Sequence, residues 1–449
     1  MVPHLVTANP GPILELERRI LDATADIERW FRLQWQDHTP PFYASTDLRN
    51  AGFKLAPVDL NLFPGGFNNL SETMLPLAVQ AAQIAVERFC CEAHNLLLIP
   101  ERHTRNTFYL QNVARLVTIL RQTGLNVRLG SLSETITEPT RVELPDGSHL
   151  VLEPLVRHGR RLGLADFDPC SIVLNNDLSA GTPEILKNLH EQHLLPPLHA
   201  GWTVRRKSLH ARAYDRVAND FARLLGVDPW LLNPLHTRCG SIDFHERTGE
   251  EALAESVDSV LAKVRAKYAE HGIAEEPFVI VKADAGTYGM GVMSVKSPDD
   301  VRALNRKTRN KMSVVKEGLQ VNEVIVQEGV RTIERVPVAG NADAVAEPVV
   351  YMIDRHVVGG FYRVHGERGV EENLNAPGMQ FVPLPEVTEP MSGGCNLPDC
   401  SKAPGIAPEN RFYMYGVVAR LALLGASLEL EMTDPERAGT ERAAMSVSA

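Results

Sequence analysis

A lysine and three glycines lie close together in the stretch with the clearest chemical potential. The β-branched run Phe278–Lys282 predicts a strand that ends in Lys282, and the following loop contains Gly286, Gly289 and Gly291. Glycine tolerates positive φ angles, and successive backbone N–H groups in such a loop can form an anion-binding hollow. A lysine ammonium adds a point charge for phosphate. The segment predicts a phosphate-binding loop, with an ordinary glycine-rich hairpin turn as the alternative.

This loop differs from the two best-known phosphate motifs. A Walker A loop requires a Gly-Lys dipeptide, which the chain lacks, and a Rossmann fingerprint opens a helix instead of joining two strands. A lysine followed by a glycine flap between strands resembles the ATP-grasp superfamily, and Val324–Val330 resembles its strand beside the adenine ring. The resemblance implies that ATP contacts Lys282, Gly286, Tyr288, Gly289, Gly291, Gln327, Glu328 and Val330.

Polar residues after the glycine loop follow the order found in ATP-grasp ligases. A predicted hairpin over residues 347–364 turns near Asp354 and contains Arg363, and an asparagine-rich stretch over residues 372–378 follows it. The resemblance implies that Arg363 touches the transferred phosphoryl group, so that Lys282 and Arg363 are the expected catalytic residues. Oxygen ligands suit Mg²⁺. The predicted metal ligands are Glu347, Asn373 and Asn375.

The second metal carboxylate has competing candidates. ATP-grasp ligases often carry a Glu-x-Asn pair, whereas Ser427–Met432 offers Glu429 and Glu431 without an asparagine. A strand in this segment would direct both carboxylates to one face. A single amphipathic helix over Phe412–Met432 would point them away from each other. The residues alone do not decide between this pair and Glu347.

Three polar-rich stretches in the first half predict a pocket for a zwitterionic amino acid. They span residues 58–69, 101–106 and 175–181 and fall at predicted strand ends or loops. An arginine can form a fork of hydrogen bonds to a carboxylate, and an aspartate can accept from an ammonium group. Turn and helix-cap chemistry is the alternative, because the same residue types favour it. The candidate substrate contacts are Asp59, Asn61, Asn68, Arg105, Asn176 and Asp177.

These strings together resemble the proteobacterial glutamate–cysteine ligase family, over nearly the whole chain up to the tail. The resemblance rests on VDLNLFPGGFNNL, ERHTRN, VLNNDLSAG, VKADAGTYGMGV and ENLNAPGM. It implies that ATP activates the γ-carboxyl of glutamate as an acyl phosphate, which the cysteine amine attacks to give γ-glutamylcysteine for glutathione synthesis. The alternatives are another ATP-grasp ligase with different amino acids and a nucleotide-binding protein without turnover.

Apolar periodicity predicts the elements that position these residues. Helices are expected over residues 12–36, 72–94, 106–123 and 250–271, strands over 96–100, 127–129 and 171–175, and a hairpin over 142–152. This alternation predicts an α/β fold class with some α+β elements. The expected domains are an N-terminal α/β substrate-binding domain (1–198), an ATP-grasp-like catalytic domain (199–432) and a disordered tail (433–449). The basic segment Gly201–Lys207 is predicted to be an exposed charge run, with a place beside ATP as the alternative.

Composition limits the partners and the compartment. The 449 residues carry a formal charge of −10, which gives no general attraction to nucleic acid or anionic lipid. No apolar run approaches the roughly 20 residues that span a bilayer, and the N-terminus lacks the basic region of a secretory signal. Six scattered cysteines predict reduced thiols. We expect a cytoplasmic protein with small-molecule partners (ATP, glutamate and cysteine) and leave open whether it forms a homo-oligomer.

Overall fold

The computed structural model describes residues 12–102, 106–286, 291–313, 320–384 and 411–437. Within these ranges, three larger β-sheets and one two-stranded sheet pack with helices, which confirms the predicted α/β class. Predicted Tyr288, Gly289 and Arg105 lie outside the described residues, as do residues 438–449 of the predicted tail.

A mostly parallel six-stranded sheet occupies the first half of the chain. Its strands in spatial order are β10 (His193–Leu195), β9 (Ser171–Asn175), β3 (Asn95–Pro100), β4 (Asn126–Ser131), β6 (His149–Pro154) and β5 (Thr140–Glu143). Only β5 and β6 are antiparallel, and they form the predicted hairpin, in which Gly147 has φ 82°. Helix α4 (Thr107–Gln122) packs on β4, and α3 (Leu75–Phe89) packs on α4. Leu96–Ile99 is fully buried, as expected for a covered parallel strand.

The central sheet joins strands from both ends of the chain. Its order is β18 (Gln380–Pro383), β17 (His356–His365), β16 (Asn341–Ile353), β1 (Tyr43–Asn50) and β2 (Leu55–Asn61), with β15 (Arg335–Val338) beside β16. All these pairs are antiparallel, and Asp47 of β1 lies opposite Val349 of β16. The sheet therefore crosses the boundary that the sequence suggested near residue 198.

A third, antiparallel sheet has its own hydrophobic core. Its order is β11 (His236–Gly240), β14 (Glu323–Glu328), β12 (Val279–Ala283) and β13 (Val292–Val295). Three helices pack with it: α6 (Glu250–Glu270), α7 (Pro298–Arg302) and α8 (Arg306–Met312). The predicted helix over residues 250–271 is confirmed, and the following Gly272 has φ 67°.

Helix α9 (Arg411–Thr433) settles the conformation of the Glu429 segment as helical. It contacts β1 and β2 on one side and α5 (Lys207–Leu225) on another. The expectation that no segment could span a bilayer was wrong for this helix, which is long and apolar enough by length and composition. However, 83% of that apolar window is buried inside the protein, as in the core helix of a folded domain.

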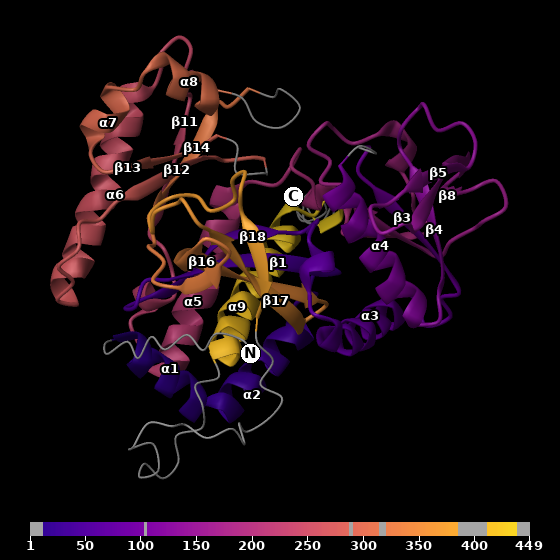
Figure 1. Cartoon of the computed structure of the whole chain (residues 1–449), viewed down its shortest axis with the longest axis horizontal. Helices are drawn as coiled ribbons and strands as arrows, with labels where there is room; N and C mark the ends of the chain where they lie inside the picture. Colours follow the sequence, from indigo (N-terminus) through magenta and orange to yellow (C-terminus); the bar gives the residue numbers. More distant parts are fainter. Residues whose placement is uncertain (1–11, 103–105, 287–290, 314–319, 385–410, 438–449) are drawn as a thin grey trace, which may run out of the picture.

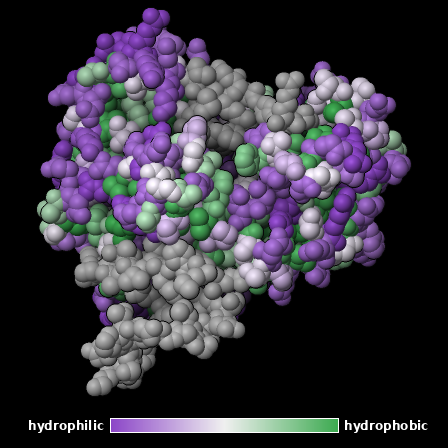
Figure 2. All heavy atoms as spheres, in the orientation of Figure 1, coloured by the Kyte–Doolittle hydropathy of each residue, from purple (hydrophilic) through white to green (hydrophobic). Residues whose placement is uncertain are grey.

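Shorter elements complete the described structure. They are α1 (Pro12–Asp22), α2 (Thr24–Asp37), β7 (Val156–His158), β8 (Arg161–Gly163) and 3₁₀ turns at Phe67–Asn69, Glu72–Met74, Glu184–Leu186, Leu198–Ala200 and Pro229–Leu231. Figure 1 shows the sheets of β11–β14 and of β3–β5 at opposite ends of the long axis, with the central sheet and α9 between them. On the same face, mainly hydrophilic side chains cover both outer parts (Figure 2).

Candidate active site

A cavity of about 780 Å³, including its open mouth, lies between the β11–β14 sheet and the central sheet. We call it the central cavity. Nine of the residues predicted to bind nucleotide, metal or substrate line it: Asp59, Lys282, Gly286, Gln327, Glu328, Val330, Glu347, Asn373 and Asn375. These residues lie between positions 59 and 375 of the sequence, and the sheet pairing brings them together.

Lys282 lies near the end of β12 and faces this cavity. Its Nζ donates to the carbonyl oxygen of Val58 at 2.6 Å and to Oε1 of Gln327 at 2.8 Å. Burial lowers the pKa of Lys282 to about 8, with Asp59 opposing the shift and Lys207 adding to it. The ammonium is thus held by two neutral oxygens, and an incoming anion would favour its charged form.

The glycine loop begins and ends in left-handed backbone. Gly286 has φ 112° and lines the central cavity, while Gly291 has φ 60°. The carbonyl of Gly291 accepts from the Ala283 N–H at 2.9 Å, which closes the connection between β12 and β13. Gly286 therefore stands at the cavity wall, and Gly291 has a role in joining the strands.

The predicted adenine-side residues lie at the end of β14 and just after it. Gln327, Glu328 and Val330 all line the central cavity, but the Glu328 side chain has partners elsewhere. The Glu328 carboxylate instead accepts from Lys54 Nζ at 2.7 Å, from Trp230 Nε1 at 3.1 Å and from the Leu235 N–H at 2.9 Å. Because these partners surround the carboxylate in a buried cluster, Glu328 could contact a nucleotide only through its backbone groups.

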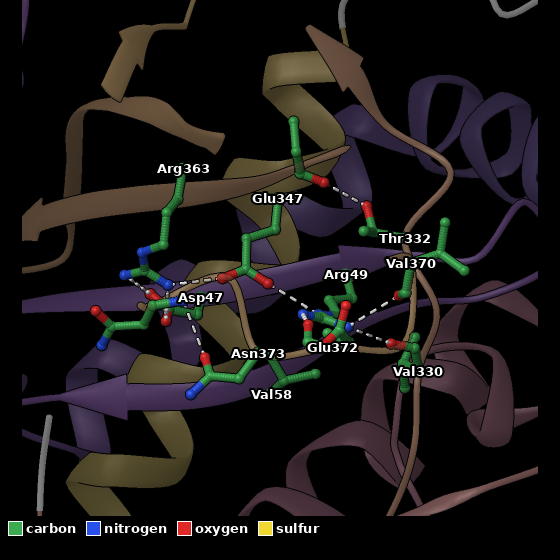
Figure 3. A network of polar contacts seen from close by, with 12 residues as sticks. Asp47, Arg49, Val58, Val330, Thr332, Glu347, Arg363, Val370, Glu372 and Asn373 are labelled. Atoms are coloured by element: carbon green, nitrogen blue, oxygen red, sulfur yellow. Dashed lines mark hydrogen bonds and ion pairs between the residues drawn. The ribbon is translucent and has the colours of Figure 1, made fainter. Parts of the chain in front are cut away.

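Two arginines and two carboxylates form a network at the base of the cavity (Figure 3). One terminal nitrogen of Arg363 donates to Asp47 Oδ2 at 2.6 Å and to Glu347 Oε1 at 2.7 Å. Arg49 Nε donates to Glu347 Oε2 at 2.8 Å. Asp47, Arg49 and Glu347 line the cavity, whereas Arg363 lies one contact behind it.

The same network shifts the pKa values of its two carboxyl groups in opposite directions. Burial works to raise the pKa of Glu347, but Arg49 and Arg363 outweigh it and hold that pKa below its usual range. Burial raises the pKa of Asp47, helped by the neighbouring Glu347 charge and opposed by Arg363. Glu347 is therefore the more firmly ionised of the two.

Asp47 and Arg49 are cavity residues that the sequence reasoning missed. They stand two positions apart in β1, so they project from the same face of the strand. Two charged residues at this spacing in a strand were the available signal. Nothing in the sequence indicates that this strand pairs with β16.

The basic segment is not the exposed charge run that was predicted. Lys207 Nζ contacts Asp59 Oδ1 at 2.6 Å, and both residues line the central cavity. Although burial works to raise the pKa of Asp59, Lys207 and Lys282 hold it well below its usual range. Arg205 is buried, with its Nε 3.0 Å from Glu429 Oε1. The second alternative, a place beside the nucleotide site, fits Lys207.

Neither carboxylate of α9 reaches the central cavity. Glu429 pairs with Arg205, and Glu431 lies 3.1 Å from Nδ1 of His38. Of the three competing carboxylates, only Glu347 lines the cavity.

Several predicted substrate residues instead form local turns. Asn61 Oδ1 accepts from the Phe63 N–H at 2.9 Å, and Asn68 Nδ2 donates to Asn69 at 3.4 Å. The carboxamide and carboxylate oxygens of Asn176 and Asp177 accept from the N–H groups two residues further on. The contacts of Asn61, Asn176 and Asp177 are the turn chemistry that the sequence left as the alternative, whereas the Asn68 contact joins two neighbouring side chains. None of the four residues lines the central cavity.

Comparisons with known proteins identify the chain's relatives. A candidate gamma-glutamylcysteine synthetase from Methylobacillus flagellatus KT has a crystal structure that is similar over 97% of this chain and 100% of that chain, with 64% identity and a TM-score of 0.85. A glutathione synthetase-like effector from Globodera pallida shares 10% identity over 77% of this chain and 80% of its own, with a TM-score of 0.38, which is too low to bear on the fold. Among curated proteins, none matches the chain. The family model GshA, glutamate-cysteine ligase, matches residues 17–430, and the chain therefore belongs to the glutamate–cysteine ligase family.

Proposed function

We propose that this protein uses ATP to join the γ-carboxyl group of L-glutamate to the amine of L-cysteine, as in the first step of glutathione synthesis. Membership of the family supports the reaction. The observation that carries the nucleotide part is the central cavity, which Lys282 and Lys207 line together with the carboxylate of Glu347 and the amides of Asn373 and Asn375. This is a cavity with cations for a polyphosphate and oxygen donors for a metal ion.

The residues of the cavity suit phosphoryl transfer by positioning and electrostatics. Lys282 and Lys207 would neutralise phosphate oxygens, and Gly286 allows the chain to approach them closely. Arg363, oriented by Asp47 and Glu347, would contribute positive charge as the acyl phosphate forms. The cysteine amine would then attack the activated carbonyl and release phosphate.

The donor set of the cavity fits Mg²⁺. Carboxylate and amide oxygens are hard ligands of the kind that Mg²⁺ prefers, and Glu347, Asn373 and Asn375 supply them beside the phosphate lysines. We propose these three residues as the metal side of the site, with Asp47 as a further carboxylate within reach. When bound, the ion would neutralise developing charge on the transferred phosphoryl group.

A cytoplasmic setting is part of the proposal. Within the described ranges, the cysteines Cys90, Cys91, Cys170 and Cys239 are all free thiols. Free thiols are typical of a reducing compartment.

A paired-substrate assay tests the function. Purified protein with ATP and Mg²⁺ is given single amino acids and amino-acid pairs while phosphate release and product mass are followed. We expect γ-glutamylcysteine, ADP and phosphate only when glutamate and cysteine are both present. Product formation from a different pair would favour another ligase, and ATP binding without amino-acid-dependent hydrolysis would favour a non-catalytic nucleotide-binding protein.

A further inference from the structure

A separate pocket of about 440 Å³, including its mouth, opens at the carboxyl ends of β3 and β9. We call it the β3–β9 pocket. The residues that line it are Glu101, Arg102, Asn176, Ser179, Ala180, Gly181 and Pro183. Glu101 and Arg102 directly follow β3, and the others follow β9.

The pocket lies where the order of the parallel strands reverses. The chain passes from β3 through α4 to β4 on one side, whereas β9 pairs with β3 on its other side. Open α/β sheets bind ligands in the crevice outside the carboxyl ends of strands at such a point. The pocket therefore has the position at which open α/β sheets commonly bind ligands.

Partly buried hydrogen bonds connect the two strands at this edge of the sheet. The Tyr109 hydroxyl accepts from the Glu101 N–H at 2.8 Å and donates to the Asn175 carbonyl at 2.8 Å, so it bridges β3 and β9. Asn176 is 7% exposed, and its Oδ1 accepts from the Leu178 N–H at 2.9 Å. That bond leaves the two N–H groups of the Asn176 carboxamide as donors on the pocket wall.

The polar groups of the pocket match both charges of an α-amino acid. Among the described residues, Arg102 makes no hydrogen bond or ion pair, and its guanidinium can form a fork of bonds to a carboxylate. Asn176 can donate to the same carboxylate. The Glu101 carboxylate lines the same pocket, where it accepts from the Asp177 N–H at 3.3 Å, and its negative charge matches that of a partner for an ammonium group.

One short segment connects this pocket to the central cavity. The Trp202 N–H donates to the carbonyl oxygen of Asp177 at 3.0 Å, on the loop that lines the β3–β9 pocket. The Trp202 ring lies 4.9 Å from Lys207 Nζ, which pairs with Asp59 in the central cavity. The Trp202–Lys207 segment therefore contacts the loop of the β3–β9 pocket at one end and contributes Lys207 to the central cavity at the other.

We propose that the β3–β9 pocket binds the α-carboxylate and α-ammonium of one amino-acid substrate, with Arg102 and Asn176 facing the carboxylate and Glu101 the ammonium. This inference rests on the proposed function and adds the amino-acid subsite to it. Arg102 was not among the residues predicted from the sequence. Its assignment comes from the pocket and from the reversal of strand order.

Two substitutions test the subsite without disturbing the Tyr109 bridge. Arg102→Ala removes the guanidinium from an exposed side chain, and Asn176→Asp keeps the acceptor for the Leu178 N–H while replacing the donor with a negative charge. Arg160→Ala removes an exposed arginine in the turn between β7 and β8, outside the pocket, and serves as the matched control. Binding of L-glutamate and of L-cysteine is measured by calorimetry on the intact protein, alongside the KM of each substrate.

We expect both substitutions to weaken binding of one amino acid by about 10- to 100-fold, the size of a lost charge-assisted contact. The KM of ATP should stay within about twofold, and Arg102→Lys should recover part of the affinity. The inference is overturned if both amino acids bind Arg102→Ala and Asn176→Asp as they bind the unaltered protein, or if ATP binding falls equally. Failure of the function is a different result, because the unaltered protein would then make no γ-glutamylcysteine.

Discussion

The buried Lys54 and the half-buried Lys282 show how the same residue type takes different roles. Burial lowers the pKa of Lys54 and of Lys282 to about 8 in each case. Lys54 neutralises Glu328 at 2.7 Å, whereas Lys282, among the described residues, contacts only a carbonyl and an amide oxygen. The charge of Lys282 is therefore the one still available to a ligand.

We predict that ATP affinity depends on the charge of Lys282. With a pKa near 8 in the free protein, this lysine is charged below that pH and neutral above it. Affinity for ATP should therefore be highest below pH 8 and fall as pH rises toward 9.5. Lys282→Met should weaken ATP binding by about 100-fold and remove this pH dependence. Titration calorimetry between pH 6.5 and 9.5 measures both effects.

The exposed Lys263 of α6 offers a matched control for that experiment. Lys263→Met should bind ATP with the affinity and pH profile of the unaltered protein. An unchanged pH profile in Lys282→Met would show that another group causes the dependence.

Glu347 is predicted to set the Mg²⁺ requirement. Glu347→Gln keeps the size of the side chain but removes the charge that Arg49 and Arg363 stabilise. We expect the Mg²⁺ concentration for half-maximal activity to rise about tenfold or more. Binding of Mn²⁺ in the presence of a non-hydrolysable ATP analogue, followed by electron paramagnetic resonance, should weaken in parallel.

The carboxylate that competed with Glu347 provides the comparison. Glu431→Gln changes a side chain that lies beside His38 and away from the central cavity. Its Mn²⁺ affinity should equal that of the unaltered protein. A loss of Mn²⁺ affinity in Glu431→Gln, or an unchanged Mn²⁺ affinity in Glu347→Gln, would contradict the assignment of Glu347 as a metal ligand.

At the scale of single elements, periodicity predicted most helices and strands to within a few residues. The predicted helix over residues 106–123 is α4, and the strand over 171–175 is β9. The helix over 12–36 is divided at Ala23, where φ is −92° and ψ is 11°. Local patterns could predict these elements because each one depends on residues near in sequence.

Part of the candidate site could not be predicted from such patterns. Lys282 and Gly286 were found because the chemistry of a phosphate loop lies in one short segment. Asp47 and Arg49 reach the cavity only because β1 pairs with β16, about 300 residues further on. The Glu328 side chain likewise points into a buried cluster because it pairs with Lys54 and Trp230, which are distant from it in the sequence.

The cluster around Glu328 is predicted to join two sheets energetically. The side chains of Lys54 and Glu328 are each about 1% exposed, so removing either partner leaves a buried charge without its counterion. Lys54→Met should lower the free energy of unfolding by about 3–5 kcal/mol. The double variant Lys54→Met/Glu328→Leu should lose much less, because it buries no unpaired charge.

Denaturant-induced unfolding of the two variants measures the difference. A third variant, Glu328→Gln, keeps an acceptor for the Trp230 N–H and reports on the charge alone. If the double variant were as unstable as Lys54→Met, packing and not the unpaired charge would explain the loss.

For the whole molecule, the central sheet determines how the chain is divided. Helix α9 packs on β1 and β2, and β1 pairs with β16, so the two ends of the chain share one core. A boundary near residue 198 separates the two outer sheets. In the central sheet, however, β1 and β2 precede this boundary and β15 to β18 follow it. A domain boundary inferred from local composition cannot show this shared sheet. Composition indicates where one segment ends, but it does not indicate that a later strand pairs with an earlier one.

The two halves of the chain are therefore predicted to depend on each other for folding. Residues 1–198 alone would present β1 without β16, and residues 199–449 alone would present β16 without β1 and α9 without the strands β1 and β2 that it packs on. An unpaired strand and an exposed apolar helix favour aggregation. We expect each fragment alone to be insoluble, and the co-expressed fragments to purify as a 1:1 complex that binds ATP. Size-exclusion chromatography with light scattering distinguishes the outcomes, and a soluble, cooperatively unfolding fragment 1–198 would show that the N-terminal half is an independent domain after all.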